Sequence, residues 1–137
     1  MEMKHFKQIL TVTTDEPEQF LNLSYEVEEC VRRSMVGDGF CVVISQHTTA
    51  SVFLEHDNEN LYKDWTRMLK ALSDGETEYK VDYISSGKAH LKQALMGASV
   101  CIPISDGKLD LGPRQYIMYG DFDGQREKNV IVKIIGE

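Results

Sequence analysis

Runs of apolar residues predict strands in the first third of the chain. Residues 5–13 are rich in Ile, Val and Thr, which favour strands, and acidic turn residues follow them. A short strand through Phe20 and Leu23 is the next expected element. Residues 40–45 form a continuous apolar run between a glycine and a polar segment, which is typical of a strand covered on both faces. We therefore expect residues 40–45 to be a central strand.

Apolar positions that recur at intervals of three and four residues predict helices. The first helix begins at Ser24 and ends before Gly37, the second follows Asn60, and a third covers residues 89–95. Ser24 and Asn60 are candidate N-caps because their side-chain oxygens can accept hydrogen bonds from the unpaired amides of a helix start. Trp65, on the apolar stripe of the second helix, is expected in the core.

The C-terminal half has the pattern of antiparallel strands. Asp106-Gly107 lies between apolar runs and predicts a two-residue hairpin, because glycine tolerates the positive φ of a type I′ turn. A second strand pair, residues 115–121 and 129–135, is expected across Asp123-Gly124. Strands grouped in this way beside helices indicate the α+β class.

Composition narrows the kind of protein. The 137 residues, 42% hydrophobic and 27% charged, are typical of one globular domain over residues 1–137. A net charge of -7 opposes binding to nucleic acid or to an anionic membrane, and no apolar run approaches the ~20 residues of a membrane span. The three cysteines show no CxxC spacing and are expected to be buried reduced thiols, which favours a cytoplasmic location.

The polar segment after residues 40–45 is the main candidate for chemistry. It places His47, Thr48, Thr49 and Ser51 where a rigid strand ends. Hydroxyls beside free amides can hold phosphate oxygens, and histidine can act as an acid, a base or a metal ligand. The alternative is a polar turn whose hydroxyls satisfy the local backbone.

Two other histidines lie in suggestive surroundings. His56 and Asp57, in an acidic segment, offer ligands of the kind that Mg²⁺ binds, although a solvated loop is the alternative. His90 opens a predicted helix, where free amides favour an anion, although a structural role is the alternative. Arg114 and Gln115, after a Gly-Pro break, can bind a phosphate or carboxylate.

Four segments, taken in order, resemble the YjbQ-like family, which is commonly labelled the secondary thiamine-phosphate synthase family. They are residues 46–51, Tyr79 with Asp82-Tyr83, residues 89–97 and residues 107–112. The similarity runs essentially from end to end and includes residues 122–126 and 132–136. It implies an α+β fold, a β-sandwich of mostly antiparallel strands with two to three helices, and a homotrimer.

The family label implies a transferase that joins a pyrimidine diphosphate to a thiazole phosphate and releases pyrophosphate. The expected partner is a phosphorylated small molecule, with a divalent metal, Mg²⁺ or Zn²⁺, as cofactor. The alternatives are a non-catalytic trimer that binds a phosphorylated metabolite or a metal, and a metal-assisted phosphoester hydrolase. The residues expected to act are His47, His90 and Asp57 in catalysis, Thr48, Thr49, Ser51, Arg114 and Gln115 in substrate binding, and His47, His90 and His56 as metal ligands.

Two positions depart from the family pattern. Relatives usually carry a histidine two residues after Tyr79, where this chain has Val81. A three-histidine site would lose its middle ligand there, and His56 or Asp57 is the candidate replacement. Relatives usually carry tryptophan where this chain has Arg114, and a cation at that place favours a more anionic ligand.

Overall fold

The computed structural model confirms the α+β class. The structure describes residues 2–74, 80 and 84–137. Every strand pairing within them is antiparallel. The elements are β1 (Lys4–Val12), β2 (Gln19–Asn22), α1 (Ser24–Ser34), β3 (Gly39–Ser45), β4 (Ala50–Glu55), α2 (Glu59–Ser73), α3 (Ile84–Met96), β5 (Ser99–Ser105), β6 (Lys108–Leu109), β7 (Tyr116–Asp121) and β8 (Lys128–Gly136).

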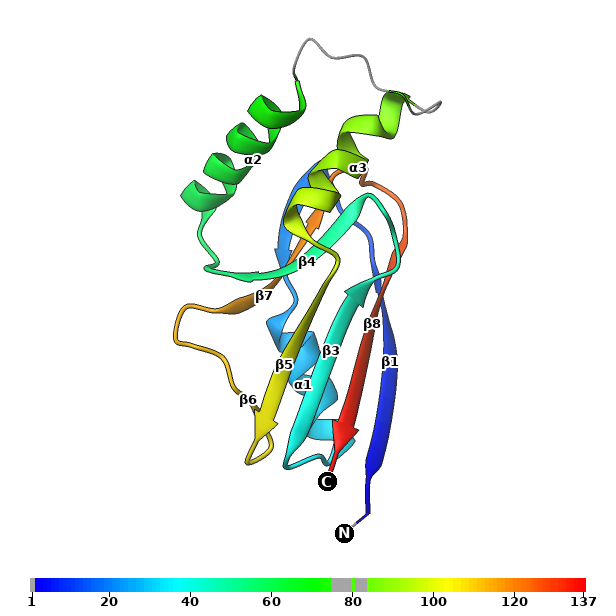
Figure 1. Ribbon diagram of the computed structural model, residues 1–137, viewed down its shortest axis with the longest axis vertical. Coiled ribbons are helices and arrows are strands. Elements are labelled where there is room, and N and C mark those ends of the chain that lie inside the picture. The colour runs from blue at the N-terminus through cyan, green and yellow to red at the C-terminus, as the bar shows by residue number, and fades with distance from the viewer. Residues whose placement is uncertain (1, 75–79, 81–83) are drawn as a thin grey trace.

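The strands form a larger and a smaller sheet with a shared core. The larger sheet has the order β1-β8-β3-β5-β6, and the smaller has the order β2-β7-β4 (Figure 1). Helix α1 and the smaller sheet pack against the same face of the larger sheet, because alternate residues of its strands turn their apolar side chains inward. Core residues come from α1 (Val27, Cys30, Val31), the larger sheet (Cys41, Val43, Ile102, Ile104, Val130, Val132, Ile134) and the smaller sheet (Ala50, Val52, Ile117, Tyr119).

Strand β3 is central, as predicted, but only one of its faces is covered within the chain. Cys41 and Val43 are fully buried, whereas Phe40 is 44% and Ile44 is 37% exposed. Figure 1 shows α1 behind β3 and β5, with the opposite face of these strands turned toward the viewer. The expectation of a strand buried on both faces is therefore wrong for the single chain, and its continuous apolar run leaves large side chains in solvent.

Both predicted helix caps are displaced. Leu23 precedes α1 without a side-chain cap, and the Ser24 hydroxyl instead accepts a hydrogen bond from the Ile117 amide at 2.9 Å. Asn58, with an extended backbone, caps α2: its side-chain oxygen accepts from the amides of Asn60 and Leu61 at 2.9 and 3.1 Å. The cap must stand just before the first helical residue, so the earlier asparagine takes this role.

One of the two predicted hairpins is confirmed. Asp106 and Gly107, with φ of 52° and 76°, connect β5 to β6 as a type I′ turn requires. The strands on either side of Asp123-Gly124 do not pair with each other. Strand β7 pairs with β2 and β4, and β8 pairs with β1 and β3, so the chain crosses between sheets here.

Helix α2 covers the smaller sheet through an aromatic cluster. Phe20 lies edge-on to Phe53 and Trp65, with ring centroids 6.1 and 5.1 Å apart. Trp65 is 8% exposed, which confirms its predicted place in the core. In the part of the chain that the structure describes, no helix is long and apolar enough to cross a membrane.

The cysteines divide by burial. Cys30 and Cys41 are buried, as predicted, but Cys101 is exposed on β5. Burial raises the pKa of the Cys41 thiol from 9.0 to about 12 and also raises the pKa of the Cys30 thiol. The thiolate form that reacts with disulfide reagents is thereby suppressed at both buried positions.

We expect dithiobis(nitrobenzoate) to modify Cys30 and Cys41 in the native protein far more slowly than in denaturant. The measurement is the rate of thiol titration at pH 8 with and without guanidinium chloride. Cys30→Ser and Cys41→Ser variants assign the slow phases. Equal rates for Cys30 or Cys41 in the native and denatured protein would contradict the burial seen in the structure.

Candidate functional site

The loop of residues 46–49, between β3 and β4, carries most of the chemistry predicted from the sequence. The Gln46 amide donates to the Asn129 carbonyl at 3.0 Å, which ties the loop to β8. The His47 amide donates to the Ser45 hydroxyl at 3.2 Å, and the Ala50 amide donates to the His47 carbonyl at 3.3 Å. This tight turn leaves the His47 side chain half-buried and Thr48 exposed.

A buried lysine supports the loop from below. The Lys128 ammonium donates to the Thr49 hydroxyl at 2.9 Å, the Asp121 carboxylate at 2.5 Å and the Asp123 carbonyl at 2.7 Å. The side chains of Lys128 and Asp121 are fully buried. Tyr119 donates its hydroxyl to the second Asp121 oxygen at 3.0 Å, and burial together with that carboxylate raises the pKa of Tyr119. All three ammonium donors have partners, as a buried charge requires.

Two of the predicted phosphate-binding hydroxyls belong to this internal support. Thr49 is 4% exposed, and its hydroxyl accepts from Lys128. Ser51 is fully buried, and its hydroxyl donates to the Gln93 carbonyl of α3 at 3.3 Å. The expectation that both hydroxyls contact a ligand is corrected for this reason, and Thr48 is the exposed hydroxyl of the set.

Helix α3 brings His90 to the same end of β4. The bond from Ser51 to Gln93 joins α3 to β4, and His90 lies about one helical turn before Gln93. His90 is half-buried. The neighbouring Lys92 is buried and pairs with Glu18 at 2.7 Å, which holds α3 against the segment before β2. His47 and His90 are therefore both carried by elements that meet at the start of β4.

The other predicted site residues lie at the far end of the same strand. Strand β4 pairs antiparallel with β7, so that Ala50 faces Asp121 and Glu55 faces Tyr116. Ala50 and Glu55 are five residues apart, which at about 3.3 Å per residue separates the two ends by roughly 16 Å. The first end holds the loop of residues 46–49. The far end holds His56, Asp57, Arg114 and Gln115.

This separation corrects the predicted catalytic and metal sets. Ligands of one zinc ion lie about 2.0–2.2 Å from it, so His56 cannot share a metal with His47 or His90 of the same chain. Asp57 likewise cannot act with His47 at one reacting centre of the chain. Among the described residues, no three His, Cys, Asp or Glu side chains converge as a metal site would need. Val81, the position of the expected middle ligand, lies outside the described residues.

The far-end residues have structural partners of their own. The Asp57 carboxylate accepts hydrogen bonds from the side-chain amide of Asn22 at 2.9 Å and from the Tyr62 hydroxyl. The His56 ring lies 6.4 Å from the Tyr116 ring, centroid to centroid. Its Nδ1 atom is the buried side-chain polar atom without a hydrogen-bond partner in the described part of the chain.

Arg114 and Gln115 occupy the connection between β6 and β7. Both side chains are exposed. The Gln115 side-chain oxygen accepts from the Gly112 amide at 2.8 Å, which closes a turn. Their predicted role in ligand binding stays a prediction, but it applies to this end of β4 and not to the loop of residues 46–49.

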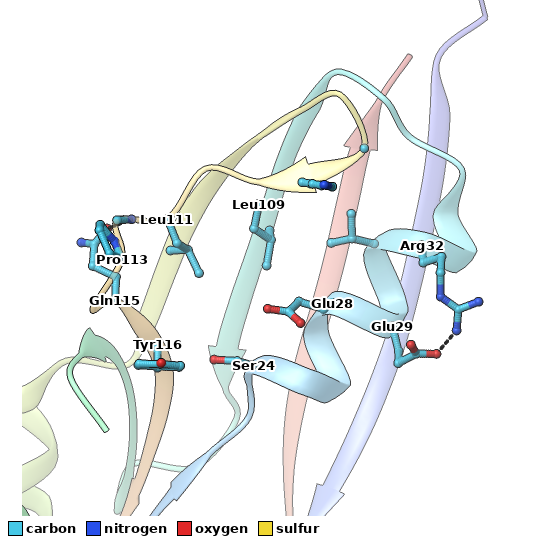
Figure 2. A pocket seen from close by; sticks show the side chains of 13 residues that line it. Ser24, Glu28, Glu29, Arg32, Leu109, Leu111, Pro113, Gln115 and Tyr116 are labelled. Carbon is cyan, nitrogen blue, oxygen red and sulfur yellow. Dashed lines mark hydrogen bonds and ion pairs between the residues drawn. The ribbon is translucent and has the colours of Figure 1, made fainter. Parts of the chain in front are cut away.

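A cleft next to this connection was not foreseen from the sequence. It has a volume of about 600 Å³ and lies between α1 and residues 107–116 (Figure 2). Its lining combines Glu28 and Ser24 of α1 with Leu109, Leu111 and Tyr116. These two segments are about eighty residues apart in sequence, and no local pattern signals that they face each other.

Comparison with known proteins decides the family. The family model described as UPF0047 protein YjbQ-like matches residues 8–137. The chain belongs to the YjbQ-like family. A UPF0047 protein from Archaeoglobus fulgidus is 35% identical over 127 residues, which cover 92% of this chain and 98% of the relative. The UPF0047 protein YugU from Bacillus subtilis is 27% identical over 93% of this chain and 97% of its own length.

Solved structures of YjbQ-like proteins confirm the fold. A YbjQ-like protein of unknown function from Sulfolobus solfataricus P2 matches with a TM-score of 0.93 and 28% identity, over 99% of this chain and all of the other. An uncharacterised YjbQ/UPF0047 protein from Clostridium acetobutylicum matches with a TM-score of 0.84 and 35% identity, over 93% and 98% of the two chains.

The expected thiamine phosphate synthase activity is corrected by these relatives. Each of the curated relatives is described only as a UPF0047 protein, and the Sulfolobus relative is of unknown function. None of these descriptions names a thiamine phosphate synthase. The site geometry of the YjbQ-like chain agrees with the correction, since the residues proposed for that reaction divide between the two ends of β4.

We expect Lys128→Met to destabilise the protein by about 3–5 kcal/mol, because it leaves the Asp121 carboxylate buried without its cation. The measurement is the free energy of unfolding from urea titration. Lys63→Met, at an exposed lysine of α2, is the control and should change that energy by less than about 0.5 kcal/mol. Equal effects of the two substitutions would contradict the role given to Lys128.

Proposed function

We propose that the YjbQ-like chain binds a small anionic molecule, of the phosphorylated class, at the loop of residues 46–49. The proposal rests on the observation that the backbone amides of Thr48 and Thr49 make no hydrogen bond to any described residue. Successive free amides in a turn can form an anion-binding surface. The exposed Thr48 hydroxyl and the His47 imidazole lie on the same turn and supply further donors.

The electrostatics beneath the loop support an anion there despite the net charge of -7. Asp121, the nearest buried carboxylate, is neutralised by Lys128. The same network fixes Thr49, so the loop changes little when a ligand binds. A preformed site of this kind spends less of its binding free energy on ordering the loop. Binding is the activity that this end of β4 supports, because Asp57, Arg114 and Gln115 lie at the other end.

We expect His47→Ala and Thr48→Val each to weaken binding of phosphate and pyrophosphate about tenfold or more. The reason is that each substitution removes a hydrogen-bond donor from the proposed anion site at the loop of residues 46–49. The measurement is calorimetric titration, supported by the thermal shift that ligand binding to the native state produces. His5→Ala is the matched control, since His5 is an exposed histidine on β1. Absence of binding by the wild type, or equal weakening by His5→Ala, would contradict the proposal.

A second observation favours self-association, and we propose that this chain forms the homotrimer expected of its family. The larger sheet presents an apolar outer face, opposite α1. Ile9 is 49%, Phe40 44% and Ile44 37% exposed. Strand register places Ile9 beside Ile131 and Ile131 beside Ile44, so the side chains are contiguous. The outer face consists of Ile9, Phe40, Val42, Ile44, Cys101, Ile131 and Ile135.

Contiguous apolar surface of this kind is characteristic of an interface between proteins. A second copy of the chain is the simplest occupant, because the face is built from strands whose identical copies can pack face to face or around an axis. Cys101 lies beside Val42 on this face, so the reactivity of its thiol shows whether another chain covers the face. Lys133, between Ile131 and Ile135 on β8 and beside Val42, and its neighbour Lys7 on β1 add two cations to this face.

We expect Phe40→Glu combined with Ile44→Glu to convert the wild-type oligomer to a monomer, because buried charges oppose association. Light scattering coupled to gel filtration measures the mass. Cys101 should react with dithiobis(nitrobenzoate) faster in the variant than in the wild type. Tyr25→Glu, an exposed residue of α1, is the control and should preserve the oligomer. A monomeric wild type would overturn the proposal.

A further inference from the structure

The cleft between α1 and residues 107–116 has the dimensions of a small-molecule site. Its volume of about 600 Å³ lies inside the range of roughly 300–1,000 Å³ that is usual for such sites. Figure 2 shows α1 as one wall and the segment from β6 to the start of β7 as the other. The cleft lies at the far end of β4 and does not include the loop of residues 46–49.

One wall of the cleft is apolar. Leu109 of β6, Leu111 of the following connection and Tyr116 at the start of β7 line it, and Figure 2 shows them across the cleft from α1. Leu109 and Leu111 pack with their inner sides on the main core. Their position is therefore set by the fold, and a ligand with a short hydrocarbon body would cover apolar surface that water now contacts.

The opposite wall presents a single uncommitted carboxylate. Glu28 projects from α1 toward Leu109 and Tyr116 (Figure 2). Its side chain makes no hydrogen bond or ion pair with any residue that the structure describes. The next residue, Glu29, pairs instead with Arg32 at the rim. Glu28 is thus the anionic group available to a molecule in the cleft.

We propose that this cleft binds a small organic cation, a protonated primary amine on a short apolar body. The ammonium would meet Glu28, and the hydrocarbon would lie on Leu109 and Leu111. The ring of Tyr116 adds a face that attracts cations. The net charge of -7 also favours a cationic ligand over an anionic one in solution.

Two sources could supply this amine chemistry: a simple alkylamine and an apolar amino acid. Lys108 of β6 also lines the cleft and, within the described chain, is without a hydrogen bond or ion pair. Its ammonium could take the carboxylate of an amino acid. Loss of amino-acid binding in Lys108→Gln, with alkylamine binding retained, would identify the amino acid as the ligand.

Calorimetric titration of the full chain with 3-methylbutylamine, leucine and 4-methylpentanoate tests the proposal. The three probes share one hydrocarbon body and differ in their charged groups. We expect the amine to bind and 4-methylpentanoate not to bind. Glu28→Gln should weaken amine binding about tenfold or more. Glu26→Gln, the same change on the same helix outside the cleft, should leave it unchanged.

Three results would overturn the proposal: no amine binding at millimolar concentration, equal binding of amine and acid, or unchanged amine affinity in Glu28→Gln. Leu111→Ala is a second variant and should also weaken the amine by removing apolar contact. Thermal unfolding of each variant reports whether it is folded, and Glu28 is exposed, so its substitution should leave stability nearly unchanged. Phosphate binding at the loop of residues 46–49 is a separate measurement and can fail independently.

Discussion

The buried ammonium of Lys128 connects the two sheets. Lys128 is the first residue of β8 in the larger sheet, and Asp121 is the last residue of β7 in the smaller sheet. Their ion pair therefore closes the crossing where the chain passes from one sheet to the other. Because Lys128 also holds the hydroxyl of Thr49, the same contact positions the loop of residues 46–49. A charge buried this completely is stable only while every partner stays in place.

The register of β4 on β7 decides which polar residues can act together. It brings His47 and Thr48 to one end, beside the helix that carries His90, and puts Asp57, Arg114 and Gln115 at the other. The two proposed ligand sites consequently lie at separate places in the chain. Free amides favour an anion at the first, and Glu28 above an apolar wall favours a cation near the second.

The outer face of the larger sheet is a third surface, and it is apolar. Its large exposed side chains, such as Phe40 and Ile44, follow from the continuous apolar run of β3. The inner residues of that run pack on α1 and the smaller sheet, while the outer ones need a partner outside the chain to leave water. Assembly and ligand binding can thus coexist, since the outer face, the loop of residues 46–49 and the cleft use different sides of the strands.

The sequence by itself determined the elements whose signals are local. The run at β3, the Asp106-Gly107 turn and the apolar stripe through Trp65 depend on near neighbours in the chain, and the structure confirms each of them. Tertiary structure alone decided which strands pair, which face of β3 is covered, and that Thr49 and Ser51 bond internally. It also brought α1 to residues 107–116, which created the cleft. These outcomes depend on contacts between residues far apart in sequence, and the local residue pattern is the same for any of the competing pairings.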